Sequence, residues 1–187
     1  LMVSDQRYDV PINYLCIHRT MAVQTERYFI LLGSNIGDRE QALHAAKKRL
    51  ALALGEPDRV SGIYETAAWG KTDQQAFLNQ VISGMSELTA LEVMEAGLAA
   101  EKAMGRVREE KWAPRTIDID LLYLGDQVID TPVLTLPHPM LHRRKFTLVP
   151  LCEIFPDFRH PVLGVSNASL LEDLDDTLEV RLFKNAQ

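Results

Sequence analysis

Apolar residues along the chain are spaced in some stretches as in a strand and in others as in a helix. The order of these stretches constrains the fold more than any other feature. Apolar runs at residues 28–32, 58–66 and 77–88 predict strands, and a further strand surrounds Asp118 and Asp120. Helical repeats separate the first strand from the second and the third from the fourth. Strand, helix, strand, strand, helix, strand is the order of a split βαβ fold. We therefore expect an α+β protein with a ferredoxin-like antiparallel sheet, helices packed on it, and a C-terminal extension.

Capping signals mark the two expected helices. Asp38 can cap the first helix with Gln41 as its capping-box partner, and Thr89 with Glu92 forms a second capping box. Gly55 suits the end of the first helix. The apolar residues at helical spacing are Leu43, Ala46, Leu50 and Leu54 in the first helix and Leu91, Met94, Leu98 and Ala99 in the second. Gly125 and Asp126 predict a two-residue hairpin between the fourth strand and residues 127–129.

The 187 residues are enough for one domain with a full core. Residues 1–26 show no clear period, and we expect an extension outside the core that is either disordered or foreign to the domain. A single domain then covers residues 27–187. Apolar residues at 148–151 and 154–156 are expected to close its core from one side.

Charge and cysteine usage narrow the class of protein. The formal net charge of −6 argues against a general nucleic-acid binder, which would carry a basic surplus. Cys16 and Cys152 are far apart and match no metal-ligand spacing, which favours a reducing, cytoplasmic setting. No apolar run is long enough for a membrane span, and we expect no signal peptide. We expect a monomer, with a dimer as the alternative.

Asp118 and Asp120 stand two residues apart within an apolar run. A strand has a period of two, so both carboxylates project from one face and Ile117, Ile119 and Leu121 from the other. Like charges so close repel each other, and a cation between them would relieve the repulsion. Hard oxygen ligands in this number suit Mg²⁺ with substrate phosphates. The alternative is a strand whose acidic face is merely solvated.

Three further sets of residues could handle phosphate or a flat ring. Arginine matches phosphate oxygens with two parallel hydrogen bonds, and a basic set precedes the aspartates. Its members are Arg106, Arg108, Lys111 and Arg115. His138 lies between two prolines and is followed by a basic run, while Phe77 and Asn79 would share a strand face. In isolation, the basic set could equally be a solvated loop, and Phe77 could be a core residue.

The chain resembles the 6-hydroxymethyl-7,8-dihydropterin pyrophosphokinase family, an enzyme family of folate synthesis, from about residue 28 to 156. Matching motifs lie in the same order and at the same spacing, at residues 32–38, 64–66, 77–79, 105–108, 112–122, 136–139, 144–146 and 150–151. The resemblance implies transfer of a pyrophosphoryl group from ATP to the hydroxymethyl oxygen of the pterin, with release of AMP. ATP and the pterin would then be the small-molecule partners.

The resemblance also assigns roles to residues. Asp118 and Asp120 would hold two Mg²⁺ ions, and Arg106 and Arg115 would bind phosphate as catalytic groups. The residues on the ATP side would be Arg108, Leu121, Thr135, His138 and Arg144. Phe77 and Phe146 would sandwich the pterin ring, and Asn79 would read its polar edge. Thr66, Trp69 and Trp112 would complete the pocket.

Two other functions remain open at the level of sequence. A nucleotidyltransferase could use the same acids and would release pyrophosphate instead of AMP. A non-catalytic ferredoxin-like module that binds a metabolite would tolerate loss of both acids. An RNA-binding module is disfavoured by the acidic balance and by the lack of aromatics interleaved on a basic strand.

Overall fold

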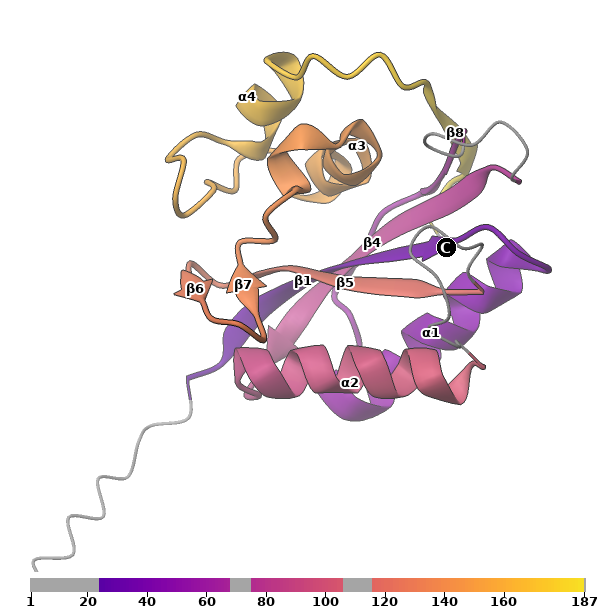
Figure 1. Cartoon of the computed structure of the whole chain (residues 1–187), viewed down its shortest axis with the longest axis horizontal. Helices are drawn as coiled ribbons and strands as arrows, with labels where there is room; N and C mark the ends of the chain where they lie inside the picture. Colours follow the sequence, from indigo (N-terminus) through magenta and orange to yellow (C-terminus); the bar gives the residue numbers. More distant parts are fainter. Residues whose placement is uncertain (1–23, 68–74, 106–115, 187) are drawn as a thin grey trace, which may run out of the picture.

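An antiparallel sheet with helices on both faces forms the body of the molecule (Figure 1). The computed structural model describes residues 24–67, 75–105 and 116–186. Within these residues the chain has a mixed α/β architecture. Its main sheet has the strand order β5-β1-β4-β3-β8, and β2 also pairs with β4. The strands of this sheet are β1 (Glu26–Ser34), β2 (Arg59–Val60), β3 (Ile63–Thr66), β4 (Phe77–Ser86), β5 (Asp118–Leu124) and β8 (Val180–Lys184).

Helices α1 (Arg39–Leu54) and α2 (Ala90–Ala103) cover one face of the sheet (Figure 1). Asp38 accepts a hydrogen bond from the Gln41 amide and caps α1, and Thr89 forms the predicted capping box with Glu92. The four apolar residues expected in the first helix are buried, which confirms that repeat. The core on this side also includes Tyr28, Ile30 and Leu32 of β1.

The buried face of α2 differs from the apolar repeat seen in the sequence. Leu91 and Leu98 are exposed, whereas Gly97 and Glu101 are buried. A Cβ atom at Gly97 would lie 3.1 Å from Cγ2 of Ile119, so the glycine allows α2 to approach β5 closely. The Glu101 side chain accepts a hydrogen bond from the Ile119 amide at 2.8 Å. Close packing and one buried carboxylate therefore decide which side of α2 faces the sheet.

The opposite face of the sheet carries α3 (Lys145–Ile154) and α4 (Asn167–Glu172), with the short helix η1 (Leu141–Arg143) before α3. Leu148, Leu151 and Ile154 of α3 pack with Phe29 and Leu31 of β1 in a second core. This confirms that residues 148–151 and 154–155 close the core from one side, whereas Pro156 is exposed.

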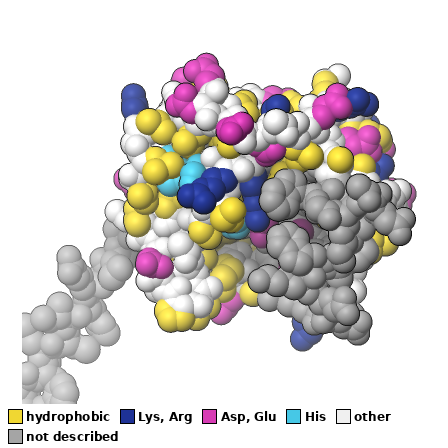
Figure 2. All heavy atoms as spheres, turned by 45° about the horizontal axis from the view of Figure 1, so that its top comes forward, with side chains coloured by type: hydrophobic (Ala, Val, Ile, Leu, Met, Phe, Trp, Pro, Cys, Tyr) yellow, Lys and Arg dark blue, Asp and Glu magenta, His cyan; other side chains and the backbone are white. Residues whose placement is uncertain are grey.

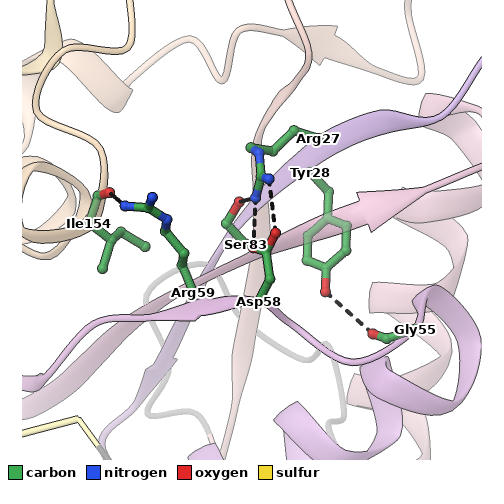
Figure 3. Close-up of polar contacts among 7 residues, drawn as sticks. All are labelled: Arg27, Tyr28, Gly55, Asp58, Arg59, Ser83 and Ile154. Carbon is green, nitrogen blue, oxygen red and sulfur yellow. Dashed lines mark hydrogen bonds and ion pairs between the residues drawn. The ribbon is translucent and has the colours of Figure 1, made fainter.

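Two arginines attach the end of α3 to the sheet. Arg59 donates a hydrogen bond to the carbonyl of Ile154 at 3.0 Å, and Arg27 makes a two-bond ion pair with Asp58 (Figure 3). Both guanidinium groups also lie over the ring of Phe155, at 5.1 Å for Arg27 and 4.8 Å for Arg59.

Two sequence expectations about strands were wrong. The run at residues 58–66 divides into β2 and β3. Between them the Ser61 hydroxyl, and not a backbone carbonyl, accepts from the Val81 amide, and the Gly62 amide donates to Glu153. The turn at Gly125 exists, but the strand after it, β6 (Ile129–Asp130), pairs with β7 (Thr135–Leu136) and not with β5. β1 begins at Glu26, one residue before the expected domain boundary. None of the described helices has the length and apolar character needed to cross a membrane.

Candidate active site

The candidate site is centred on Gly33, where three strands run side by side. Gly33 of β1 pairs with Asn79 of β4 on one side and with Asp118 of β5 on the other. A Cβ atom at Gly33 would lie 3.4 Å from Oδ1 of Asn79 and 3.8 Å from Cβ of Asp118. The side chains of Asn79 and Asp118 therefore point to the same face of the sheet.

The carboxylates of β5 project toward the α3 side of the sheet. Asp120 pairs with Leu31, which packs in the core beneath α3, and neighbouring residues across a sheet project to the same side. Ile117 and Leu121 are buried with the α1 and α2 core, and Ile119 packs against it. The alternation predicted for β5 is confirmed. Asp118 and Asp120 are only partly exposed, and each takes part in polar interactions.

His138 joins this group from the loop between β7 and η1. Its backbone amide donates to the carbonyl of Leu122 in β5, which fixes the loop against the strand. Burial, together with the nearby Arg144 guanidinium, lowers the pKa of the imidazole to about 4, against weaker opposing effects from a backbone hydrogen bond and from Asp118. His138 therefore lies within electrostatic reach of both Arg144 and Asp118.

Arg144 and Phe146 bring the start of α3 to the same face. The Arg144 guanidinium lies 5.6 Å from the centre of the Phe146 ring, and Phe146 packs against the core beneath α3. Figure 2, in which the top of Figure 1 is turned toward the reader, shows basic side chains next to histidine side chains on this face. Next to them in the chain, Nε of Arg143 donates a hydrogen bond to Nε2 of His142.

The expected pterin wall is formed by the paired ends of β3 and β4. Thr66 pairs with Phe77, and Tyr64 pairs with Asn79. Nδ2 of Asn79 donates to Oγ1 of Thr66 at 3.0 Å, and both residues are buried. This hydrogen bond holds the Asn79 amide in one orientation, and Phe77 beside it is half-buried.

Two of the predicted residues do not join the group through their side chains. Leu121 is buried in the α1 and α2 core, on the opposite face from Asp118 and Asp120. Thr135 is exposed in the two-stranded β6–β7 sheet. Five further predictions lie outside the described residues: Trp69, Arg106, Arg108, Trp112 and Arg115.

Sequence reasoning missed two residues that position the site. Arg39, the first residue of α1, binds Glu65 of β3 at 2.8 Å and the carbonyl of Ala76 at 2.7 Å, next to Phe77. Ser34 is buried and donates to the carbonyl of Thr116 at 2.6 Å, just before β5. Each residue lies close to a strand end, but their partners are distant in sequence, so no local pattern indicated them.

The acids fit a hard divalent cation that shares its shell with phosphate. In the described parts of the chain, no group of three or more His, Cys, Asp or Glu side chains could hold a metal ion. Mg²⁺ commonly takes only one or two carboxylates and completes its shell with water and phosphate oxygens. Asp118 and Asp120 on one strand face match that requirement. Paired carboxylates, a neutral histidine and an arginine on one sheet face are typical of a phosphate-transferring enzyme.

Comparisons with known proteins agree with this class and narrow it. The family model of 7,8-dihydro-6-hydroxymethylpterin-pyrophosphokinase (HPPK) matches residues 29–156. This chain belongs to that family. It is 48% identical to the 2-amino-4-hydroxy-6-hydroxymethyldihydropteridine pyrophosphokinase of Methylorubrum extorquens, over 70% of this chain and 84% of the relative. The enzyme of the same name from Synechocystis is 40% identical, over 78% of this chain and 75% of the relative.

A solved structure shares the fold. The crystal structure of HPPK-DHPS from Plasmodium falciparum superposes with a TM-score of 0.65 at 15% identity, covering 82% of this chain and 46% of that chain.

Proposed function

We propose that this chain transfers a pyrophosphoryl group from ATP to 6-hydroxymethyl-7,8-dihydropterin in folate biosynthesis, giving the pterin diphosphate and AMP. The family match across residues 29–156 is the observation that carries the proposal. The electrostatic influence of Arg144 and Asp118 on His138 supports it. As the family implies, ATP is the co-substrate.

We further propose that Asp118 and Asp120 hold two Mg²⁺ ions. Two carboxylates that project from the same face of β5 support this assignment. When bound, the ions would neutralise charge on the triphosphate. Arg144 contributes a fixed positive charge beside them, and Arg106 and Arg115 are proposed to contact phosphate as well. Transfer then depends on alignment and charge stabilisation more than on a strong base.

His138 is proposed to act as a neutral hydrogen-bond donor on the ATP side. Its pKa of about 4 leaves the imidazole uncharged near neutral pH. Nδ1 accepts a hydrogen bond from the Met140 amide at 3.2 Å, so the single ring proton resides on Nε2. Nε2 can then donate to a ribose or phosphate oxygen. Arg108, Leu121 and Thr135 remain proposed for the same side, with Leu121 contributing through its backbone.

The pterin is proposed to stack between Phe77 and Phe146. Asn79 would read its polar edge, since one amide hydrogen is used by Thr66 and Oδ1 stays directed toward the Gly33 side. Trp69 and Trp112 are proposed to complete the pocket together with Thr66.

The finer description of the protein is also a proposal. The order β5-β1-β4-β3, with α1 and α2 on one face, supports a ferredoxin-like core of two split βαβ units. We propose a single domain over residues 27–187 and an extension before it. The protein is further proposed to act as a monomer in the cytoplasm, in keeping with the free thiol of Cys152.

Product analysis tests the function. The protein is incubated with ATP, Mg²⁺ and the hydroxymethyl-dihydropterin, and nucleotides are separated by chromatography. AMP should form only with the pterin present. Asp118→Asn and Asp120→Asn should each lower the rate at least about 100-fold, because each removes charge that stabilises the transferring group. Asp126→Asn removes an exposed carboxylate from the turn after the same strand and serves as the control.

Other products would contradict the proposal. Release of pyrophosphate in place of AMP would identify a nucleotidyltransferase. Full activity of Asp118→Asn would show that this carboxylate takes no part in the reaction and would favour a non-catalytic binding module.

A further inference from the structure

The first turn of α3 lacks two of its usual supports. Arg144 occupies the N-cap position and makes no side-chain capping hydrogen bond. Pro150 lies inside the helix and has no N–H, so it cannot donate to the carbonyl of Phe146 four residues earlier. This turn carries Phe146 and follows directly on Arg144, both of which are proposed to face the substrates. Its position must therefore be fixed from elsewhere.

Asp176 supplies the missing cap from a distant part of the chain. Oδ2 of Asp176 accepts a hydrogen bond from the Lys145 amide at 3.0 Å, and Oδ1 accepts one from the Leu178 amide at 2.9 Å. Both carboxylate oxygens are thus engaged, and the side chain is half-buried. A negative charge is also favourable at a helix N-terminus. From sequence alone, the acidic run at residues 172–176 indicates no more than a solvated surface.

The same segment continues directly to the other wall of the site. Val180, four residues after Asp176, begins β8 and pairs with Thr66 of β3. Thr66 in turn holds the Asn79 amide. β8 also packs tightly against Gly62, the residue just before β3, since a Cβ atom there would lie 2.8 Å from Cδ1 of Leu182 in β8. Residues 176–180 therefore connect the start of α3 with the end of β3, and they lie beyond the region matched by the family model.

We propose that Asp176 is a positioning residue for the pterin site. Its carboxylate holds the Lys145 amide and so sets the place of the Phe146 ring relative to the wall formed by Thr66 and Phe77. It acts through α3 and through β8, not by touching substrate. The inference rests on the proposed function, because it assigns Phe146 to the pterin.

Steady-state kinetics of three variants test the proposal. Asp176→Ala removes the acceptor, Asp176→Asn retains an oxygen that can cap a helix, and Asp175→Ala removes the exposed neighbouring acid. Loss of a cap of this kind should raise the KM for the pterin about fivefold to tenfold in Asp176→Ala. Asp176→Asn keeps one acceptor oxygen for the two amides that Asp176 binds, so its KM for the pterin should rise less than that of Asp176→Ala. Asp175→Ala should be unchanged. Thermal melts confirm that each variant is folded.

The pattern of constants separates positioning from simple loss of stability. A merely structural role would lower the active fraction, so kcat would fall while the KM for the pterin stayed constant. That result, or an unchanged KM in Asp176→Ala, would overturn the positioning role while AMP formation by the wild type upheld the function. A wild type that forms no AMP would overturn the proposed function and the positioning role with it.

Discussion

His138 illustrates how the surroundings of one side chain set its charge. It is half-buried, its backbone is tied to β5, and Arg144 lies near it. Burial and the charge of Arg144 disfavour a positive charge on the imidazole, whereas backbone hydrogen bonding and Asp118 favour it more weakly. The sequence indicated His138 through the two prolines around it, but the neutral state depends first on burial and then on Arg144, and both arise only in the folded chain. The residue type was therefore predictable, and its charge was not.

The pH dependence of stability should report this neutral state. The pKa of His138 is about 4 in the folded protein, below the ordinary value of 6.5. The unfolded chain then binds the proton first, so stability is lost as the pH falls from about 6.5 to about 4. Between pH 7 and 4.5 the wild type should lose about 2 kcal/mol more unfolding free energy than His138→Gln, a figure reduced for partial exposure.

Urea unfolding at a series of pH values measures this difference. The pKa values of His142 and His160 are also lowered by burial, so only the difference between wild type and variant isolates His138. Parallel curves for the two proteins would contradict the prediction.

Among the elements, α2 and β5 show where reasoning from periodicity stops. The Asp38 N-cap, the capping box of Thr89 and Glu92, and Gly55 predicted the helices close to their observed bounds, because those signals are local. The buried side of α2 was not predictable, because it depends on the close approach of Gly97 to Ile119 and on a buried carboxylate. The pairing of β6 with β7 was missed for a similar reason, since a turn signal does not specify which strand receives the next one.

Removal of the Glu101 carboxylate should weaken the attachment of β5. In Glu101→Ala the Ile119 amide loses its acceptor, and an unpaired buried N–H costs about 1–3 kcal/mol of unfolding free energy. The same change should lower activity, because Ile119 lies between Asp118 and Asp120. Glu95→Ala, an exposed site on the same helix, is the control and should stay within about 0.5 kcal/mol. Equal stability of both variants by chemical denaturation would show that the hydrogen bond is dispensable.

For the whole molecule, the two faces of the sheet have different tasks. The α1 and α2 face is a continuous apolar core, whereas the α3 and α4 face combines a smaller core with the polar residues of the candidate site. The sequence predicted only the acidic and the apolar face of β5, through its alternation. It did not predict β8, whose partner β3 is more than a hundred residues earlier, because long-range register leaves no local pattern.

Ligand binding should stabilise the whole domain only when magnesium is present. At 100 times its Kd, a non-hydrolysable ATP analogue should add about 2.7 kcal/mol to the unfolding free energy. For a domain of this size that corresponds to a rise in Tm of roughly 5–10 °C. Chelation by EDTA should abolish most of the rise, and Asp118→Asn should show little of it. Scanning calorimetry measures the Tm of the unliganded wild type, of the wild type with analogue and magnesium, of the wild type with analogue and EDTA, and of Asp118→Asn with analogue and magnesium. A full rise in Tm in EDTA would contradict a metal-dependent site.

The hydrogen bond from the Lys145 amide to Asp176 should control how fast that amide hydrogen exchanges with solvent. That amide hydrogen is held by a side chain from a distant segment, and not by the helix it begins. It can exchange with deuterium in the solvent only when residues 176–180 move away from α3. The exchange rate of this single amide therefore measures how often the two walls of the site separate, without any substrate being added.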